Sequence, residues 1–375
     1  MELHEDLLSD AEAAEEADHG GTLRLVAATG ARIRRAAALR EFDLAADQAL
    51  RDLAADGRPR AMIVLGYGSG ATVAQLLTAV AGSSATVPVV PVPGPTLPGW
   101  VGPLDLVVVA STAGRAPEIS VALAEAGRRG SRIVVVAPPA SPIGELCMQI
   151  RGTLIAMEDD VAPVWSRLWS IAIPTLIAAE AAGVIPAQRY DAAASAADEA
   201  AIRCRPSQEP FVNPAKEIAL RLGESVTAVW ASGQVAAVAA ERLADQAALR
   251  AGVPASHAIL PDLGRGQLGL LDGPFAARAQ DLFRDPFEDG GGERSAAVVL
   301  LAEHGADPRL AVVEGLVRDR NIPLTVFTAE QTDPLARAAH LIALADFAAA
   351  YLALLTGVGP DQGHTIDEYR VRTAQ

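Results

Sequence analysis

The chain has 375 residues, of which 50% are hydrophobic and 21% charged, and its formal net charge is −15. This composition is typical of a globular protein with a sizeable core, and the length suggests two domains. No block of Lys or Arg is large enough for a nucleic-acid footprint, so DNA and RNA partners are not expected. Cys147 and Cys204 are too few for a disulfide framework and lack metal-ligand spacing, which predicts two buried thiols and no metal site.

The start of the chain, MELHEDLLSDAEAAEEAD, lacks the basic and apolar regions of a signal peptide. We also find no apolar run that approaches the roughly 20 residues of a membrane helix, so we expect a cytoplasmic protein with no membrane partner. Residues 1–18 show no clear apolar face, which predicts fraying there. We expect residues 1–40 to form a helical, partly disordered segment.

Two series of short, β-branched runs predict two sheets. The first series is AMIVLG from Ala61, VPVVPV from Val87, DLVVVAS from Asp105, RIVVVAP from Arg132 and TLIAM from Thr153. The second series is VTAVWAS from Val226, SHAIL from Ser256, AAVVLLAE from Ala296, PLTVFTAE from Pro323 and HLIAL from His340. The spacing leaves room for a helix between successive runs, which is typical of a parallel α/β sheet. The sequence therefore predicts an α/β fold of two tandem units, each a five-stranded parallel sheet flanked by helices.

Between the two series, residues 166–213 are rich in alanine at helical spacing, with interruptions at Pro174, Pro186 and Pro206. We place the unit boundary at Pro206, so that the first unit covers 41–205 and the second covers 206–375 and ends in a helix. The glycine-rich segment EDGGGERS, from Glu288, is predicted to be a flexible loop.

The first candidate site is the turn in GYGSGATVAQLL, which begins at Gly66 directly after a predicted strand. Backbone N–H groups and the dipole of the following helix can hold a phosphate or carboxylate at such a turn. The spacing differs from GxGxxG, and no acidic residue lies suitably downstream to hold a ribose, so a dinucleotide site is not indicated. A tight turn that simply requires glycine explains the motif equally well.

The second candidate site is ASTAGRAPEI, which follows the run DLVVVAS. Ser111 and Thr112 offer hydroxyls, Gly114 allows the backbone to turn, and Arg115 adds a cation that can pair with a phosphate. Taken alone, these residues also fit an ordinary polar helix start, with Pro117 in the first turn.

Four further segments, together with the two turns described above, resemble segments of one known protein family. They are VNPAK at 212–216, WASGQVAAVAAERLADQ at 230–246, VPA at 253–255 and DFAAAYLALLTGVGP at 346–360. In this order and separation, the sequence resembles the sugar isomerase (SIS) domain family. Within that family it is similar to the bifunctional phosphoglucose/phosphomannose isomerases over about residues 66–369. The resemblance implies a homodimer without cofactor, a sugar-phosphate ligand, and a place in hexose phosphate or nucleotide-sugar metabolism.

The resemblance also implies aldose/ketose isomerisation, in which a carboxylate moves a proton between C1 and C2 while a histidine helps to open the ring. Leu249 stands where these relatives carry the carboxylate, and Arg265, in LPDLGRGQLGL, stands where they carry the histidine. Leucine cannot transfer a proton, and arginine is effectively always protonated. Loss of a positioned acid or base slows such chemistry by about 10²- to 10⁴-fold each, so we expect little isomerase activity.

The candidate sugar-phosphate contacts follow partly from the resemblance and partly from charge. They are Ser69, Gly70, Ser111, Thr112, Arg115, Arg167 and Arg265. Arg115 and Arg265 are cations where the relatives carry other residues, and arginine favours binding of an anion. Gly70 aligns with a serine of the relatives, and two hydroxyls of their second turn are absent here. Arg167 is equally well explained as an arginine on a helix surface.

Three functions stay open from the sequence. The first is a sugar-phosphate-binding protein with weak or no isomerase activity. The second is an active isomerase in which Asp245, Asp262 or His257 replaces the missing groups. The third is a structural or regulatory subunit that binds no ligand, because residues such as Leu249 fill its cleft.

Overall fold

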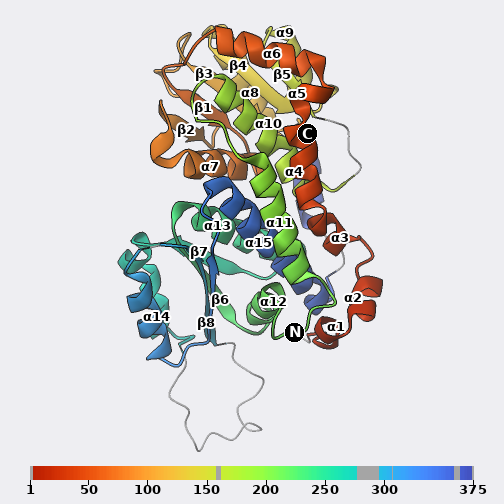
Figure 1. The fold of residues 1–375 in the computed structure, drawn as a ribbon, viewed down its shortest axis with the longest axis vertical. Helices are drawn as coiled ribbons and strands as arrows, with labels where there is room; N and C mark the ends of the chain where they lie inside the picture. Colours follow the sequence, from red (N-terminus) through yellow and green to blue (C-terminus); the bar gives the residue numbers. More distant parts are fainter. Residues whose placement is uncertain (1–2, 158–161, 277–294, 306, 359–363, 374–375) are drawn as a thin grey trace, which may run out of the picture. The chain divides into compact units, whose positions relative to one another are not determined.

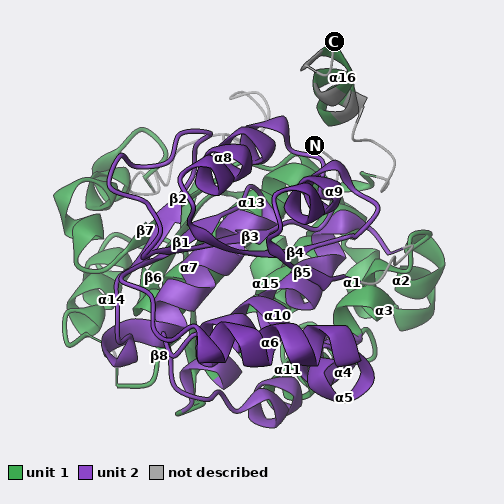
Figure 2. Ribbon diagram, turned by 90° about the horizontal axis from the view of Figure 1, so that it is seen from above, with its two compact units in different colours: residues 1–27, 196–332, 337–375 green, residues 28–195, 333–336 purple. Residues whose placement is uncertain are grey.

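The computed structural model describes residues 3–157, 162–276, 295–305, 307–358 and 364–373 (Figure 1). The chain forms two compact units (Figure 2). Unit 1 comprises residues 1–27, 196–332 and 337–375, and unit 2 comprises residues 28–195 and 333–336. Each unit contains one parallel sheet, which confirms the predicted α/β class. Most of the predicted loop at Glu288 lies outside the described residues.

The sheet of unit 2 has the five predicted strands, all parallel, in the order β2-β1-β3-β4-β5. They are β1 (Met62–Leu65), β2 (Val89–Val92), β3 (Leu106–Ala110), β4 (Arg132–Ala137) and β5 (Thr153–Ala156). β1 and β3 are buried along their whole length because helices cover both faces. The strand order reverses between β1 and β3, and open parallel sheets bind ligands outside the carboxyl ends of the strands at such a point.

Helices cover the two faces of this sheet. The helices of unit 2 are α4 (Thr29–Ala37), α5 (Leu39–Phe42), α6 (Leu44–Ala55), α7 (Ser69–Ala81), α8 (Pro117–Arg128), α9 (Pro142–Gln149) and α10 (Leu168–Ala181), with the 3-10 turns η1 (Gly82–Ser84) and η2 (Val164–Arg167). α8 and α9 pack on one face through residues such as Leu123 and Ile143, and α7 and α10 lie on the other (Figure 2). Right-handed crossovers require this division, because the chain leaves β1 and β3 in opposite directions.

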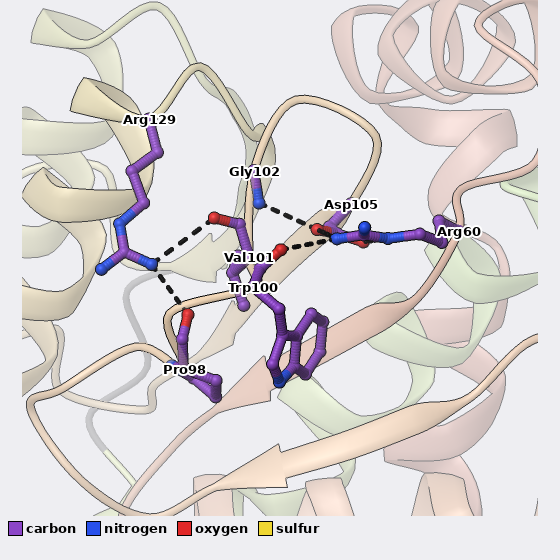
Figure 3. Close-up of polar contacts among 7 residues, drawn as sticks. All are labelled: Arg60, Pro98, Trp100, Val101, Gly102, Asp105 and Arg129. Carbon is purple, nitrogen blue, oxygen red and sulfur yellow. Dashed lines mark hydrogen bonds and ion pairs between the residues drawn. The ribbon is translucent and has the colours of Figure 1, made fainter.

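The amino edge of the same sheet is fixed by polar contacts (Figure 3). Arg60 Nε and Nη2 donate to the two carboxylate oxygens of Asp105 at 2.9 and 2.6 Å, and Asp105 is fully buried. The same carboxylate accepts from Gly102 N at 2.8 Å, and Arg60 also donates to Trp100 O at 2.6 Å. Arg129 holds the preceding part of this loop by donating to Pro98 O at 2.8 Å. These bonds immobilise the loop that leads into β3.

The sheet of unit 1 has four strands among the described residues, all parallel, in the order β7-β6-β8-β9. They are β6 (Val226–Ser232), β7 (Ala255–Ile259), β8 (Ala296–Glu303) and β9 (Leu324–Ala329). The fifth predicted strand, HLIAL from His340, is wrong, because these residues lie inside helix α15 (Pro334–Thr356). A short apolar run has no periodicity that separates a buried strand from a buried helix, and this one continues to Leu355.

The other helices of unit 1 precede its sheet in the sequence, connect its strands or follow the last strand. They are α1 (Asp6–Ser9), α2 (Ala11–Ala17), α3 (Thr22–Ala27), α12 (Pro214–Glu224), α13 (Gln234–Ala251), α14 (Leu310–Arg318) and α16 (His364–Thr373), with η3 (Asp262–Arg265) and η4 (Gln267–Asp272). α11 (Tyr190–Cys204) begins in unit 2 and ends in unit 1. Contrary to our expectation of no long apolar run, α15 is long and apolar enough to cross a membrane, but 89% of its most apolar window is buried, as in a core helix.

Lys216 joins the N-terminal segment to the core of unit 1. Its side chain is only 1% exposed, and Nζ donates to Leu8 O, Pro206 O and Gln208 O at 2.6, 2.7 and 2.8 Å. A buried ammonium group needs an acceptor for each of its three N–H groups, and these three carbonyl oxygens supply them. We had expected fraying before residue 18, but residues 3–18 include two helices tied down by this contact. Both cysteines are buried free thiols, as predicted.

Candidate anion-binding site

The turn after β1 passes very close to the end of β3. A Cβ atom on Gly70 would lie 2.2 Å from Ala110 O, and one on Gly66 would lie 2.4 Å from the carbonyl carbon of Gly70. Gly68 has φ 53°, which also favours glycine. Gly70 therefore has no room for the serine that the resemblance places there. Ser69, the first residue of α7, is the partly exposed hydroxyl at this turn.

The turn after β3 is held by its own hydroxyl. Ser111 Oγ accepts from Gly114 N at 3.0 Å, and Gly114 O accepts from Ile143 N at 3.0 Å. Thr112 is 7% exposed, whereas Arg115 is exposed to solvent. The polar residues of this turn thus differ in their surroundings: Ser111 holds the backbone of the turn, Thr112 is buried, and Arg115 is exposed to solvent.

The structure brings these two turns to one edge of the sheet. β1 and β3 are hydrogen-bonded neighbours, with Leu65 paired to Val109, so their carboxyl ends lie side by side. Ser69, Ser111 and Arg115 accordingly stand at the point where the strand order reverses. α7 begins there, and its first N–H groups and dipole favour an anion.

Arg167 also follows a carboxyl end, that of β5, but it is engaged locally. It closes η2, is partly buried, and donates from Nε to Ala162 O at 2.6 Å. This bond fixes the loop that starts α10, a helix that packs beside α7. The described hydrogen bond of Arg167 is thus made to the backbone of its own loop.

The equivalent turn of unit 1 has a different content. β6 is followed by Gly233, with φ 111°, and then by α13, while Glu303 ends the neighbouring strand β8. Glu303 Oε1 accepts from Val235 N at 2.7 Å and from Ala236 N at 3.1 Å. Glu303 Oε2 forms an ion pair with Arg337, and both side chains are 13% exposed. A carboxylate of the chain itself thus occupies the helix start.

The two positions of the missing catalytic groups lie on the surface of unit 1. Leu249 is 44% exposed in the last turn of α13. The Arg265 side chain is 82% exposed on η3, where its Nε lies 3.9 Å from Asp262 Oδ1. Solvent screens a pair of this kind, so it contributes little to stability. Neither Leu249 nor Arg265 can act as the base that the resemblance implies.

Asp245, one of the proposed substitutes, lies on α13 four residues before Leu249. Partial burial and the nearby charge of Glu241 raise the pKa of Asp245, although His257 and Arg242 oppose this shift. His257 is exposed on the edge strand β7, and Asp262 is 81% exposed beside Arg265. Asp245 and His257 therefore interact, whereas the described ion pair of Asp262 is with Arg265.

Arg242 and Gln246 lie in α13, within the segment 230–246 that carries the resemblance, and Arg242 has a structural role. Arg242 Nε and Nη2 donate to Asp346 of α15 at 2.7 and 3.0 Å, and their side chains are 3% and 9% exposed. Gln246, four residues further on, is 6% exposed. Sequence reasoning did not identify Asp346, Glu303 or Arg337. The available signal for Glu303 was a lone carboxylate that ends the otherwise apolar run AAVVLLAE.

Comparison with known proteins gives the family. Residues 211–372 match the family model of the bacterial phospho-glucose isomerase C-terminal SIS domain. Residues 211–372 of the chain therefore match an SIS domain. No curated protein matches the sequence of this chain.

Solved structures show a likeness of fold over nearly the whole chain. The C-terminal domain of glucosamine-fructose-6-phosphate aminotransferase from Francisella tularensis has a TM-score of 0.64 at 11% identity, over 92% of this chain and 98% of that one. A hypothetical protein from Thermus thermophilus has a TM-score of 0.66 at 14% identity, over 99% and 95%. A putative tagatose-6-phosphate ketose/aldose isomerase from Clostridium novyi gives 0.62 at 13%, over 97% and 94%. At these identities, the likeness shows a shared fold.

Proposed function

We propose that this SIS protein binds a sugar phosphate, or a closely related anion, at the carboxyl edge of the unit 2 sheet and has weak or no isomerase activity. The observation that carries the proposal is the adjacency of the two turns after β1 and β3, where the strand order reverses. The start of α7 supplies N–H donors, Ser69 and Ser111 supply hydroxyls, and Arg115 supplies positive charge. With a net charge of −15, the protein attracts an anion only where such donors are gathered.

The absence of isomerase chemistry in this proposal rests on Leu249 and Arg265. Neither side chain can accept and return a proton at neutral pH. Arginine instead suits the binding of a phosphate or carboxylate. We further propose, from the family resemblance, a cytoplasmic homodimer. Light scattering during gel filtration tests the dimer directly, because it measures the molar mass in solution.

An active isomerase is the second candidate, and Asp245 is the observation that favours it. A carboxyl with a raised pKa beside a histidine is a plausible general base. A coupled assay for conversion of mannose 6-phosphate and glucose 6-phosphate to fructose 6-phosphate tests this idea. Turnover that Asp245→Asn abolishes would replace the first proposal with the second. We expect no turnover.

Binding is tested by calorimetric titration of mannose 6-phosphate, glucose 6-phosphate and fructose 6-phosphate. Arg115→Ala is the decisive variant, and Arg58→Ala is its matched control, because Arg58 is an exposed arginine just before β1 at the opposite edge of the same sheet. Loss of a charge-assisted hydrogen bond weakens binding by about 10- to 100-fold. Equal affinities for the two variants, or no binding by the wild type, would refute the proposed site.

A further inference from the structure

We propose that unit 1 contains a second oxyanion site, at the start of α13, which Glu303 fills from within the chain. Glu303 Oε1 accepts from two successive backbone N–H groups, of Val235 and Ala236, at 2.7 and 3.1 Å. Phosphate and carboxylate ligands bind helix starts through the same donors and the same dipole. The occupant here is a side chain, so the site is closed to external anions in the wild-type protein.

Arg337 gives the site a cation that does not depend on Glu303 for its position. Arg337 Nη1 pairs with Glu303, while Nε donates to Gln331 O at 2.9 Å and Nη2 to Thr332 O at 3.5 Å. These carbonyls anchor the guanidinium from the segment after β9. When the carboxylate is removed, Arg337 therefore remains beside the start of α13. A guanidinium in that place matches the geometry of a phosphate or carboxylate.

The turn itself is also shaped around an anion. A Cβ on Gly233 would lie 2.1 Å from Glu303 Oε1, so the missing side chain lets the backbone approach the carboxylate. The preceding residue, Ser232, is 0% exposed, and its Oγ has no hydrogen-bond partner within the described parts of the chain. A buried hydroxyl without a partner is unfavourable unless a ligand or water satisfies it. Ser232 thus leaves a polar group available next to the turn.

Comparison with unit 2 isolates the residue that closes the site. β8 lies beside β6 as β3 lies beside β1, and β3 ends in Ala110 where β8 ends in Glu303. Alanine leaves the first helix start open, and glutamate covers the second. Removal of the Glu303 side chain should therefore convert the closed site into an open one, whether or not unit 2 binds sugar phosphate.

The test is phosphate-dependent stabilisation of Glu303→Ala. Truncation to alanine removes the carboxylate and one methylene, which leaves about the space that an inorganic phosphate fills. We expect Glu303→Ala to unfold at a lower temperature than the wild type, and inorganic phosphate to raise its Tm by roughly 2–4 °C more than it raises that of the wild type. Sodium chloride at matched ionic strength should not reproduce this difference.

Glu303→Gln is the matched control, because it keeps the size of the side chain and an oxygen that accepts from the helix start. This variant should respond to phosphate as the wild type does. If Glu303→Ala is not obtained folded, Glu303→Ser makes the same space and must show the same gain. A folded Ala or Ser variant without additional phosphate stabilisation, or an equal gain in Glu303→Gln, would overturn the proposal. Phosphate binding in unit 2 is read separately from the wild-type response, so the two proposals fail independently.

Discussion

In each unit, a helix begins where the strand order reverses. The two helix starts differ in the side chains that lie beside them. In unit 2, β3 ends in Ala110, and the start of α7 is bordered by Ser69, Ser111 and Arg115. In unit 1, the carboxylate of Glu303 accepts from the start of α13, and Arg337 neutralises it. The same backbone arrangement therefore has a different role in each unit. We propose that it is open for an external anion in unit 2, whereas in unit 1 it is capped by a carboxylate of the chain itself.

The largest predicted effect tests whether the buried ion pair of unit 1, between Arg242 and Asp346, stabilises the fold. Asp346→Ala leaves the guanidinium of Arg242 buried without its carboxylate. Removing one partner of a buried pair destabilises a protein by about 3–5 kcal/mol, which chemical unfolding will detect as a large fall in midpoint.

Leu249→Glu is the control for Asp346→Ala, since it restores the carboxylate of the isomerase signature at a position that is 44% exposed. Its effect on stability should stay within about 0.5 kcal/mol. A small effect of Asp346→Ala would contradict the structural role of the retained signature residues.

A second prediction concerns the close approach of the two turns in unit 2. Gly70→Ala places a Cβ 2.2 Å from Ala110 O, where only backbone movement can relieve the clash. We expect a loss of stability of about 3 kcal/mol and loss of sugar-phosphate binding. Gly99→Ala in the same unit meets no atom within 4 Å and should be nearly neutral. Thermal unfolding and titration of both variants measure the difference, and similar behaviour would mean that the turns are less tightly packed than described.

The smallest predicted effect is a pH dependence of stability that arises from His340 in unit 1. Burial lowers the pKa of His340 below its ordinary value of 6.5, and the charge of Arg203 adds to this, while Ala196 O and the charge of Glu199 oppose it. Above pH 6.5 the native and unfolded states both hold neutral His340, and its contribution to stability is fully present. As the pH falls below 6.5, the unfolded chain takes up the proton first, so stability is lost until the native pKa is passed.

His340→Gln should therefore lose less stability than the wild type between about pH 6.5 and 5. The difference in the free energy of unfolding should reach up to about 1 kcal/mol. Urea unfolding of wild type and variant across this range measures it. A steeper decline in the variant would show that the native pKa is raised instead.

The sequence predicts the unit 2 site better than the unit 1 site for a physical reason. Parallel strands bring their carboxyl ends to one edge, so glycine-rich and hydroxyl-rich turns after AMIVLG and DLVVVAS must meet there. Glu303 ends an apolar strand and looks like an ordinary surface carboxylate, since its partners come from two other elements. Long-range contacts of this kind, like those of Lys216 with Leu8 O, have no local pattern.

The mistaken strand at His340 has a related cause. The four residues after His340, LIAL, are all apolar because this part of α15 is buried, and the run therefore shows neither the period of a strand nor that of a surface helix. Length was the better guide, because a mostly apolar stretch, interrupted by Arg337, His340 and Asp346, runs from Leu335 to Leu355, far beyond the length of an ordinary strand.

One measurement tests the contrast between the two helix starts most directly: calorimetric titration of inorganic phosphate into the wild type, Arg115→Ala and Glu303→Ala. The account predicts one site per chain in the wild type, a site weakened by about 10-fold or more in Arg115→Ala, and a second site in Glu303→Ala. The account would be contradicted by a wild-type protein that binds no phosphate, or by an Arg115→Ala variant that binds it as tightly as the wild type.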